Sequence, residues 1–555
     1  MSKNPLTSKN YAATDCLLLL LFGAVIYLPF LGVSAWDGNE PIRVIIAKEM
    51  LRSGNWTIPI LHGHPYFAKP PLLNWLIAAS GSLFGSVNEW TSRIPSVLTM
   101  FLTVLSVYFL TVKWLGRDGR FFASLMTLCM IGLMSKGREA EIESLQIFFI
   151  SFILLVWING YVRQWKSSVL WGLALSLVGI GFLSKGPQVI FFFYMTVVPY
   201  LLIRKRMALF FSKGHALGVG LMLLVLSLYM LSVLQWTTLD QYMQTWIKEG
   251  IQRTESRHSL TFLVHLLEYL LNLAMYFMPC ILFLIPLVVY KELRKEAKKL
   301  FGNELFMFSF IVVAANFPLY WLLPNMHARY FLPAGPFVAL VAAVIFELYL
   351  RKLPALSAID TFFIKFLKVF TLLTIFLAAS VIPLVIFLHL KFSFPLLFFI
   401  TCALFSGIVI LYKSKSVQLT HIPIYITLIT ALFFLIYTDL DIQMDSKSEI
   451  NAARIAGEIN LLLPPDVDMV YEIGYRRFLP LTCYIDRKVY QLDTFAELKT
   501  LEKKKGKIYF IFDTAFLDNA NAESKNIFLH DLHWIKVYSN KFKDKRGEII
   551  VGTSS

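Results

Sequence analysis

Apolar stretches long enough to cross a lipid bilayer recur along most of this chain. A membrane-spanning helix needs about 20 consecutive, mostly apolar residues, and here 57% of the residues are hydrophobic while only 16% are charged. We interpret about thirteen such windows as transmembrane helices. They fall at 16–35, 94–115, 121–135, 145–162, 169–183, 188–203, 216–235, 268–290, 305–323, 331–350, 367–389, 394–412 and 423–438. This composition excludes a water-soluble globule and predicts a polytopic α-helical membrane protein.

Basic residues predict how these helices are oriented. If the N-terminus is cytoplasmic, every loop assigned to the inside is basic, whereas the short outer loops carry far fewer lysines and arginines. The inner clusters include Lys113, Arg117 and Arg120; Arg204, Lys205, Arg206 and Lys213; and Lys291, Arg294, Lys295, Lys298 and Lys299. Membrane topology therefore explains the net charge of +16 without a nucleic-acid partner. An odd number of crossings places the C-terminus outside.

The first apolar window has an alternative interpretation as a cleaved signal peptide. Val33-Ser34-Ala35 resembles the small-residue site at which such peptides are cut. The apolar run is longer than the core of a typical signal peptide, which is about 7–15 residues. The length favours a retained first helix.

Three polar segments remain, all on the predicted outer side. They are a first loop at 36–93, a second loop at 236–267 and a tail at 440–555. We therefore divide the chain into a transmembrane domain, 1–439, and a periplasmic domain, 440–555. In the first loop, apolar residues between 42 and 50 recur at helical spacing among charged ones, which predicts an amphipathic helix on the membrane surface.

The tail alternates helix and strand signals. A capping box, Ser446-x-x-Glu449, precedes a predicted helix near 448–460, and a second helix is expected at 495–503. Predicted strands are Met469–Ile473, Val489–Leu492, Ile508–Phe512, Trp534–Tyr538 and Glu548–Val551. The pattern predicts a small α/β domain.

The first loop holds the residues most typical of chemistry. Trp36-Asp37-Gly38-Asn39-Glu40 follows the first span, and Tyr66-Phe67-Ala68-Lys69-Pro70-Pro71-Leu72 comes some thirty residues later. A carboxylate at a membrane boundary can take a proton from an acceptor hydroxyl, and a lysine can neutralise a departing phosphate. The alternative is that Asp37 and Glu40 only cap the N-terminus of the surface helix.

These motifs resemble the first outer loop of membrane glycosyltransferases that use polyprenyl-phosphate sugars. This superfamily includes the lipid A aminoarabinose transferases and the protein O-mannosyltransferases. The shared pattern is an acidic pair, a helix ending near Ala-x-Glu-Met, then Ser-Gly-x-Trp-x-x-Pro and Tyr-Phe-x-Lys-Pro-Pro-Leu. The resemblance implies the C-type glycosyltransferase fold, and the span layout with an outer tail matches the aminoarabinose branch.

The resemblance also implies roles for residues of the first loop. Lys69 would hold the phosphate of the lipid-linked sugar, and Tyr66 would line the same site. Glu40 matches the second acid of the family's pair, but Asn39 replaces the first acid, and Ile42 replaces an arginine. Asp37 and Arg43 are the candidate substitutes, so the sequence leaves open which carboxylate acts.

Further candidates lie at the predicted outer ends of later spans. Glu143 stands where the family has an aspartate before its fourth span, and it faces either a cavity or solvent at the interface. Lys185 resembles the lysine of the family's Lys-Gly-Pro turn, although a snorkelling lysine is equally compatible. Arg329 and Tyr330 resemble its Arg-Tyr-x-x-Pro element and are candidates for phosphate contact or for interfacial anchoring.

Other features carry weaker signals. In the second loop, Arg253 and His258 roughly match a basic and a histidine position of the family. Asp439-x-Asp441 and Asp466-x-Asp468 spell a DxD sequence that is common in polar linkers. The five cysteines form no CxxC motif or disulfide framework. We assign no cofactor and no metal ligand, and leave dependence on a divalent cation open.

Together these observations predict an integral-membrane glycosyltransferase of a bacterial inner membrane. The donor is a sugar on a polyprenyl phosphate, undecaprenyl phosphate by resemblance, and the acceptor at the outer face is a lipid or a protein. The resemblance favours lipid A phosphate, as in 4-amino-4-deoxy-L-arabinose transfer, over the acceptor of a protein O-mannosyltransferase. A hydroxyl acceptor would need Glu40 or Asp37 as a base, whereas a phosphate acceptor would only be oriented by them.

A transporter is the alternative from another functional class. It would show helices broken at mid-membrane and internal pseudo-symmetry, and the sequence indicates neither.

Overall fold

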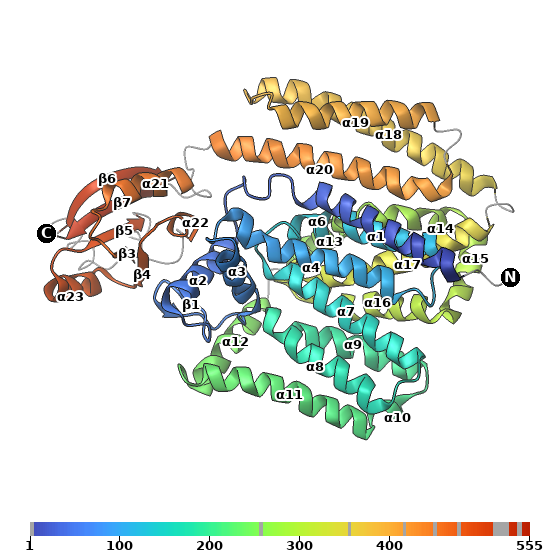
Figure 1. Cartoon of the computed structure of the whole chain (residues 1–555), viewed down its shortest axis with the longest axis horizontal. Helices are drawn as coiled ribbons and strands as arrows, with labels where there is room; N and C mark the ends of the chain where they lie inside the picture. The colour runs from blue at the N-terminus through green and yellow to red at the C-terminus, as the bar shows by residue number, and fades with distance from the viewer. Residues whose placement is uncertain are drawn as a thin grey trace. The chain divides into compact units, whose positions relative to one another are not determined.

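The chain divides into two compact units (Figure 1). The computed structural model describes residues 5–254, 259–352, 357–413, 418–447, 452–473, 479–513, 532–540 and 547–554. The first unit comprises Met1–Leu31, Ala68–Leu73 and Arg93–Asp441; the second comprises Gly32–Phe67, Asn74–Ser92 and Ile442–Ser555. The first outer loop is therefore split between the units, and most of it belongs with the tail.

Nine helices of the described residues are long and apolar enough to cross a membrane. They are α4 (Glu89–Leu110), α7 (Ile142–Val162), α8 (Ser167–Lys185), α11 (Lys213–Val233), α16 (Glu304–Leu322), α17 (Gly335–Lys352) with the preceding turn η3 (Ala328–Ala334), α18 (Ser357–Phe387), α19 (Phe394–Lys413) and α20 (Ile422–Lys447). The prediction of a multi-pass helical membrane protein is confirmed.

The remaining predicted spans are shorter or interrupted helices. They correspond to α1 (Pro5–Tyr27), α5 (Arg117–Cys129) with α6 (Ile131–Lys136), α9 (Gln188–Ile203), and α13 (Ser259–Tyr276) with α14 (Ile285–Val289). The described residues thus hold nine full-length spans, or ten if the α13–α14 pair counts as one. The number thirteen stays a prediction, and the first helix ends at Tyr27 instead of residue 35.

The expectation that no helix is broken is wrong. The α13–α14 pair bends by 94° just before Pro279, which has no N–H to continue a helical ladder. A second break lies between α5 and α6, where Ile131 donates its N–H to the Met278 carbonyl at 2.9 Å. The two breaks therefore satisfy each other's backbone groups inside protein, which membrane proteins require of irregular backbone. The average hydropathy of 268–290 shows that this segment is apolar, but it does not show that the helix axis bends within it.

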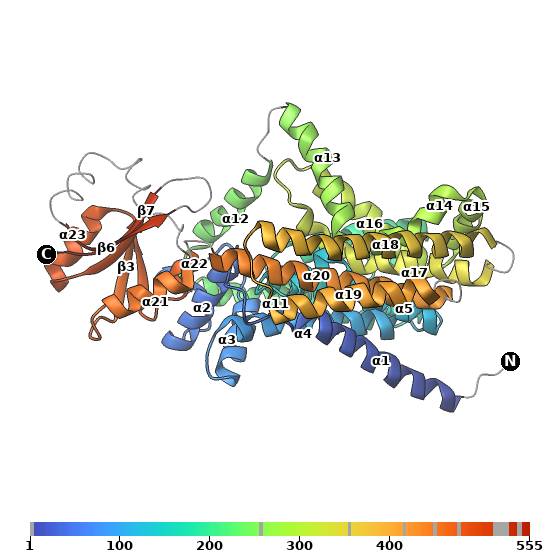
Figure 2. The same ribbon diagram turned by 90° about the horizontal axis from the view of Figure 1, so that it is seen from above.

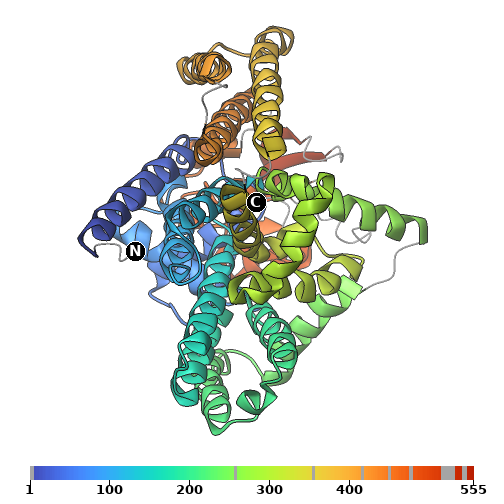
Figure 3. The same ribbon diagram turned by 90° about the vertical axis from the view of Figure 1, so that its right-hand side faces the viewer.

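Helix α17 forms the centre of the first unit. In the span from Ala328 to Arg351, 89% of the apolar window is buried, against 28% in α18 and in α19. Phe346 of α17 stacks on Phe122 of α5 with ring centroids 4.5 Å apart. Helices α18 and α19 lie side by side (Figures 2 and 3). They expose large apolar residues such as Phe376 and Phe405, as lipid-facing helices do.

The second unit begins with the first outer loop. The predicted helix is present as α2 (Glu40–Ser53); its position at a membrane surface stays a prediction. A hairpin of β1 (Ile60–Leu61) and β2 (His64–Pro65) follows, and α3 (Leu72–Leu83) comes after it. Neither the hairpin nor α3 is predicted from the sequence. The segment 236–267, predicted as a loop, is mostly helical, with α12 (Leu239–Thr254) and the start of α13.

The predicted α/β tail is confirmed as a five-stranded mixed sheet. The strands run in the order β4 (Lys488–Leu492), β3 (Met469–Ile473), β5 (Tyr509–Asp513), β7 (Gly547–Ser554) and β6 (Leu532–Asn540). Strands β4, β3 and β5 are parallel, and the other pairs are antiparallel. Helix α23 (Phe495–Lys505) covers one face, while α21 (Ala452–Leu462) and α22 (Leu479–Thr482) contribute to the core on the other.

The predicted capping box is only partly described. Ser446 lies in α20, which is described to Lys447, and Glu449 falls outside the described residues. Helix α21, described from Ala452, corresponds to the helix predicted near 448–460.

The hairpin of the first loop is joined to the tail sheet within the second unit. Gln491 of β4 donates its N–H to the His62 carbonyl at 3.0 Å, and His64 Nε2 lies 2.9 Å from the Gln491 carbonyl oxygen. His62 Nδ1 lies 2.7 Å from Glu472 Oε2, and both side chains are 1% exposed. The edge strand β4 is therefore partly covered by chain from the first loop.

Candidate active site

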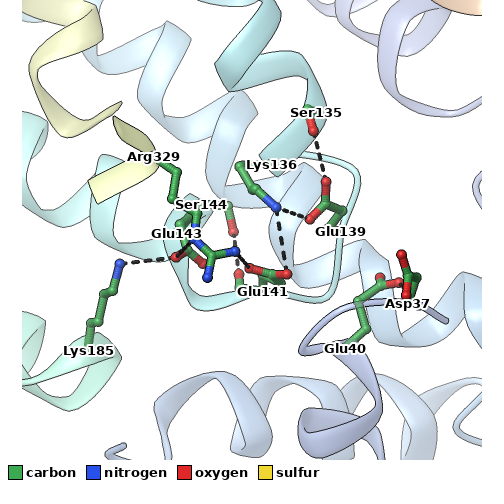
Figure 4. Close-up of polar contacts among 10 residues, drawn as sticks. All are labelled: Asp37, Glu40, Ser135, Lys136, Glu139, Glu141, Glu143, Ser144, Lys185 and Arg329. Atoms are coloured by element: carbon green, nitrogen blue, oxygen red, sulfur yellow. Dashed lines mark hydrogen bonds and ion pairs between the residues drawn. The ribbon is translucent and has the colours of Figure 1, made fainter. Parts of the chain in front are cut away.

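A cluster of acids and bases lies within the first unit (Figure 4). Lys185 Nζ is 3.1 Å from Glu143 Oε1, and Arg329 Nη1 is 3.4 Å from Glu141 Oε2. Lys136 Nζ lies 3.6 Å from the other Glu141 oxygen. We call these five residues the ion-pair cluster. It brings together three residues predicted from the sequence, Glu143, Lys185 and Arg329.

Three members of the ion-pair cluster are buried, and one of them is not fully satisfied. The side chains of Glu141 and Glu143 are 4% exposed and that of Lys185 is 5% exposed. Buried charges are costly unless they are paired or face a functional cavity. Glu143 Oε2 is buried and has no hydrogen-bond partner in the described part of the chain. A buried carboxylate oxygen without a partner indicates a place for a ligand.

Glu141 lies in the loop just before α7, and its environment favours the protonated form. Burial first, and then the nearby Glu143 carboxylate, raise the pKa of Glu141 to about 8. The ordinary value for glutamate is about 4.3, so most Glu141 side chains carry a proton at pH 7. The three positive charges of Lys136, Lys185 and Arg329 then outnumber the two negative charges of Glu143 and the adjacent Glu139. Excess positive charge in a buried site suits an anionic ligand.

A glycine turn holds Lys185 in place. Lys185 is the last residue of α8, and Gly186 follows with φ +94°, a conformation that costs glycine little. A Cβ atom on Gly186 would lie 2.4 Å from the ring of Trp246 on α12. The missing side chain thus allows the indole to pack directly against the turn that follows Lys185.

A cavity of about 310 Å³ in the first unit is lined by Lys69 and Lys185. Its walls include the apolar residues Phe191, Leu319, Leu323 and Met326, together with Pro187, Gln188, Trp246, Gly250 and Tyr320. The Lys69 ammonium lies 5.6 Å from the centre of the Trp246 ring. Apolar walls with a few convergent charged groups are typical of ligand sites. These walls and two ammonium groups suit a lipid with an anionic headgroup.

Tyr330 stands beside Lys185. The Lys185 ammonium lies 4.1 Å from the centre of the Tyr330 ring, close enough for a cation–π contact. Gln188 donates its side-chain N–H to the Tyr330 carbonyl at 2.7 Å. This bond fixes η3, and with it Arg329, against the start of α9.

The predicted acids of the first loop lie in the second unit and differ in burial. Glu40 is 3% exposed, whereas Asp37 is exposed; both are labelled in Figure 4. Glu40 Oε2 accepts a hydrogen bond from the Asp37 N–H at 3.2 Å. Asn39 occupies the N-cap position of α2 and makes no side-chain capping bond. Asp37 therefore does not cap the helix, and the burial difference favours Glu40 as the acting acid.

Arg43 and Tyr66 also lie in the second unit and touch each other. The Arg43 guanidinium carbon is 5.6 Å from the centre of the Tyr66 ring. Arg43 is 4% exposed, and its Nε and Nη1 atoms have no hydrogen-bond partner among the described residues. Glu40 and Arg43 are three positions apart on α2 and so share one face. An unsatisfied buried guanidinium beside an acid indicates a second polar site.

Other predicted residues are not placed in a site. Arg253 lies in α12, and His258 falls outside the described residues. In the described part of the chain, no three histidine, cysteine, aspartate or glutamate side chains group as metal ligands.

Four residues of the site are not predicted from the sequence: Glu141, Lys136, Trp246 and Gln188. The acidic run 139–143 could have indicated Glu141. The other three reach the site through contacts between separate helices and turns, which leave no local sequence pattern.

Comparisons with known proteins agree with these features. A family model described as dolichyl-phosphate-mannose-protein mannosyltransferase matches residues 68–232. An undecaprenyl phosphate-alpha-4-amino-4-deoxy-L-arabinose arabinosyl transferase of Yersinia enterocolitica serotype O:8 is 31% identical over 216 residues, 38% of each chain. A protein of the same name from Pseudomonas aeruginosa is 31% identical over 216 residues, 38% of this chain and 39% of its own. The matches span under half the length of these relatives.

A solved structure matches almost the whole chain. The crystal structure of ArnT from Cupriavidus metallidurans bound to undecaprenyl phosphate aligns over 98% of both chains, with a TM-score of 0.70 and 16% identity. This likeness establishes the fold. With the sequence matches, it confirms the resemblance predicted from the Lys-Pro-Pro stretch.

Proposed function

We propose that this protein transfers a sugar from an undecaprenyl-type polyprenyl phosphate to an acceptor at the outer face of a bacterial inner membrane. One observation carries the proposal. The buried Lys185 lines an apolar cavity together with Lys69, and Arg329 lies 3.8 Å from Glu143, the ion-pair partner of Lys185. The names of the related proteins and the ligand of the matching structure support the same donor class.

The donor would bind in two parts. Its prenyl chain stays in lipid and enters the apolar walls at Phe191 and Leu319, while its phosphate lies among the ammonium groups of Lys69 and Lys185. Arg329 can offer the phosphate a fork of donors once it loosens its contact with Glu141. The buried setting strengthens each charge interaction relative to water.

Transfer would be a single displacement that inverts the anomeric carbon. An acceptor oxygen forms a bond to that carbon while the bond from the carbon to the phosphate oxygen breaks, and the electron pair leaves on the phosphate. The cations stabilise this charge as it develops. A hydroxyl acceptor gives its proton to Glu40; a phosphate acceptor is already ionised and Glu40 only orients it.

The acceptor we propose is lipid A phosphate, as the aminoarabinose transferase relatives suggest. The family match over 68–232 supports a lipid-phosphate-linked sugar donor for either acceptor class. The broken α13–α14 pair meets one expectation for a transporter. Broken backbone is equally compatible with the fold of the matching ArnT structure.

Transfer by the purified protein tests the proposal. Full-length protein in lipid nanodiscs is incubated with undecaprenyl-phosphate-linked aminoarabinose and lipid A, and mass spectrometry follows the product. We expect Lys69→Ala and Lys185→Ala to lose at least about a hundredfold in rate, the size of a lost electrostatic contact to the leaving group. Lys248→Ala, an exposed position on α12, is the matched control and should keep its rate.

Two results would overturn the proposal. One is transfer that continues at the wild-type rate in both lysine variants. The other is no transfer by the wild-type protein to lipid A or to any protein acceptor supplied with the same donor.

A further inference from the structure

A hollow of about 730 Å³ opens on the tail domain. It lies between α23 and the strands β3 and β4, with His64 of the first-loop hairpin at its side, and all of its residues belong to the second unit. We call it the tail groove. Its lining residues with polar or aromatic side chains are His64, Tyr471, Tyr490, Gln491, Asp493, Glu497, Thr500 and Lys505. Nothing in the proposed transfer reaction uses them.

Helix α23 presents small side chains to the groove. Ala496 and Thr500, four positions apart and so on one helix face, both line it. Leu498, which lies between them in sequence, is fully buried against the sheet core. The helix is therefore held firmly on one side and leaves open space on the other.

The aromatic floor of the groove is fixed in position. The His64 and Tyr490 ring centroids are 5.0 Å apart, and His64 Nε2 also contacts the Gln491 carbonyl oxygen. On the hairpin, Gly63 has φ +81°, and a Cβ atom there would lie 2.2 Å from the Tyr490 ring. Glycine thus lets the hairpin pack directly on the tyrosine. Preformed aromatic surfaces lose little entropy on binding.

The two ends of the groove carry opposite charge. Lys505 closes α23, and its ammonium lies 3.2 Å from the Tyr471 hydroxyl. Asp493 and Glu497 lie at the start of the same helix, where Glu497 Oε2 accepts the Asp493 N–H at 3.0 Å. One end therefore offers a donor to an anion, and the other offers acceptors to hydroxyl or amino groups.

We propose that the tail groove binds a saccharide that carries a phosphate group. The apolar face of a sugar ring packs on Tyr490, its hydroxyls bond to the carboxylate end, and its phosphate pairs with Lys505. Tyrosine offers both an apolar face and a polar hydroxyl. Small-molecule sites typically combine aromatic walls with a few polar groups that orient the ligand. If the proposed function holds, this ligand is part of the acceptor, a step that rests on that function.

A peptide strand added to the edge of β4 fits the structure less well. The Gln491 N–H and carbonyl already bond to His62 and His64. An incoming strand would have to displace the hairpin to pair with the backbone there.

Saturation-transfer NMR on the full-length protein in nanodiscs tests the inference. The probe is glucosamine 1-phosphate, and glucosamine and inorganic phosphate are measured as separate arms. We expect transfer to the ring protons of glucosamine 1-phosphate. Thr500→Trp and Ala496→Trp fill the groove from two positions of α23 without removing a contact, and each should reduce binding at least fivefold. Thermal unfolding checks that both variants fold.

The controls separate this inference from the proposed function. Lys505→Gln should weaken glucosamine 1-phosphate binding about tenfold and leave glucosamine unchanged, whereas Lys503→Gln, exposed on the same helix end, should change neither. Lys69→Ala should bind the probe as wild type does, even where sugar transfer is lost. Binding that survives both tryptophan variants overturns the inference, as does no binding, or full competition by inorganic phosphate alone.

Discussion

At the scale of single residues, some buried charged groups lack a hydrogen-bond partner for every polar atom in the part of the chain that the structure describes. Glu143 keeps one buried carboxylate oxygen without a hydrogen bond, and Arg43 keeps two buried nitrogens without one among the described residues. Such groups cost free energy in the empty protein because they have left water without full compensation. A ligand that supplied the missing partners would recover this loss, so under the proposed function we expect substrate to bind at these atoms.

Burial separates the two candidate acids, and this yields the first prediction. Glu40 is buried beside Arg43 on α2, while Asp37 is exposed to solvent. We expect Glu40→Gln to lower the rate of sugar transfer at least a hundredfold with a hydroxyl acceptor, whose proton Glu40 would take. The loss should be smaller with lipid A phosphate, which Glu40 would only orient. Asp37→Asn should stay within about threefold of wild type, because solvent already screens its charge. Initial rates at saturating donor measure both, and equal losses would contradict the assignment.

Glu141 predicts how donor binding depends on pH. Its pKa is raised to about 8 by burial and by Glu143, so the proton is present at pH 7 and is lost as the pH rises past 8. The added negative charge opposes a sugar phosphodiester, which keeps one negative charge throughout this range. We expect donor affinity to be level up to about pH 7 and to fall about tenfold between pH 7.5 and 9.

Titration of donor binding in nanodiscs at several pH values measures this dependence. Glu141→Gln removes this proton equilibrium while keeping a similar shape, so its affinity should fall less than that of the wild type across the same range. A wild-type affinity that rises above pH 8, or an undiminished slope in Glu141→Gln, would contradict the assignment to Glu141.

At the scale of elements, one buried pair holds the first-loop hairpin on the tail sheet. His62 and Glu472 are both 1% exposed and 2.7 Å apart. Removing one partner of a buried pair leaves a charge or polar group uncompensated, at a cost of about 3–5 kcal/mol. We therefore expect Glu472→Ala to increase amide hydrogen exchange in β3 and β4 by at least a hundredfold.

A matched control lies on the same domain. Lys536 and Glu458 form an ion pair at 2.6 Å, but their side chains are 44% and 37% exposed. Exposed ion pairs contribute little, so Glu458→Ala should leave exchange in β3 and β4 unchanged. Equal rates of amide hydrogen exchange in Glu472→Ala and Glu458→Ala would refute the stabilisation of the sheet by the buried pair.

Elements with a strong local pattern could be predicted from the sequence. Every predicted tail strand is present, because alternating β-branched and aromatic residues such as those of Met469–Ile473 form a repeated local signal. The hairpin was not predicted, since two strands of two residues have no periodicity. The bend before Pro279 was missed for a related reason, because apolar composition continues across it.

The candidate site likewise combines residues that the sequence predicts and residues that it does not. Short motifs resembling those of the family predict four of them, Lys69, Glu143, Lys185 and Arg329. Trp246 reaches the Lys185 turn only because Gly186 lacks a side chain. That contact joins residues 60 positions apart and depends on how α12 packs, which the sequence alone does not fix.

At the scale of the whole molecule, the distribution of charge predicts which side each end occupies. The helix α15 (Lys291–Lys299) carries lysines and arginine on a segment assigned inside, and the tail is assigned outside. Positive charge is retained on the cytoplasmic side during insertion. The proposed reaction needs the same arrangement, because a tail that binds an outer-face acceptor must itself be outside.

Cysteine labelling of the full chain tests this topology. Lys295 and Lys503 are both exposed, so Lys295→Cys and Lys503→Cys should each give a reactive thiol, with the wild-type protein measuring the background of its own five cysteines. A membrane-impermeant maleimide should label Lys503→Cys in intact spheroplasts and Lys295→Cys only after lysis. The reverse pattern would place the tail in the cytoplasm, where neither the proposed acceptor nor the sugar-loaded outer leaflet is available, and would contradict the outer-face reaction as a whole.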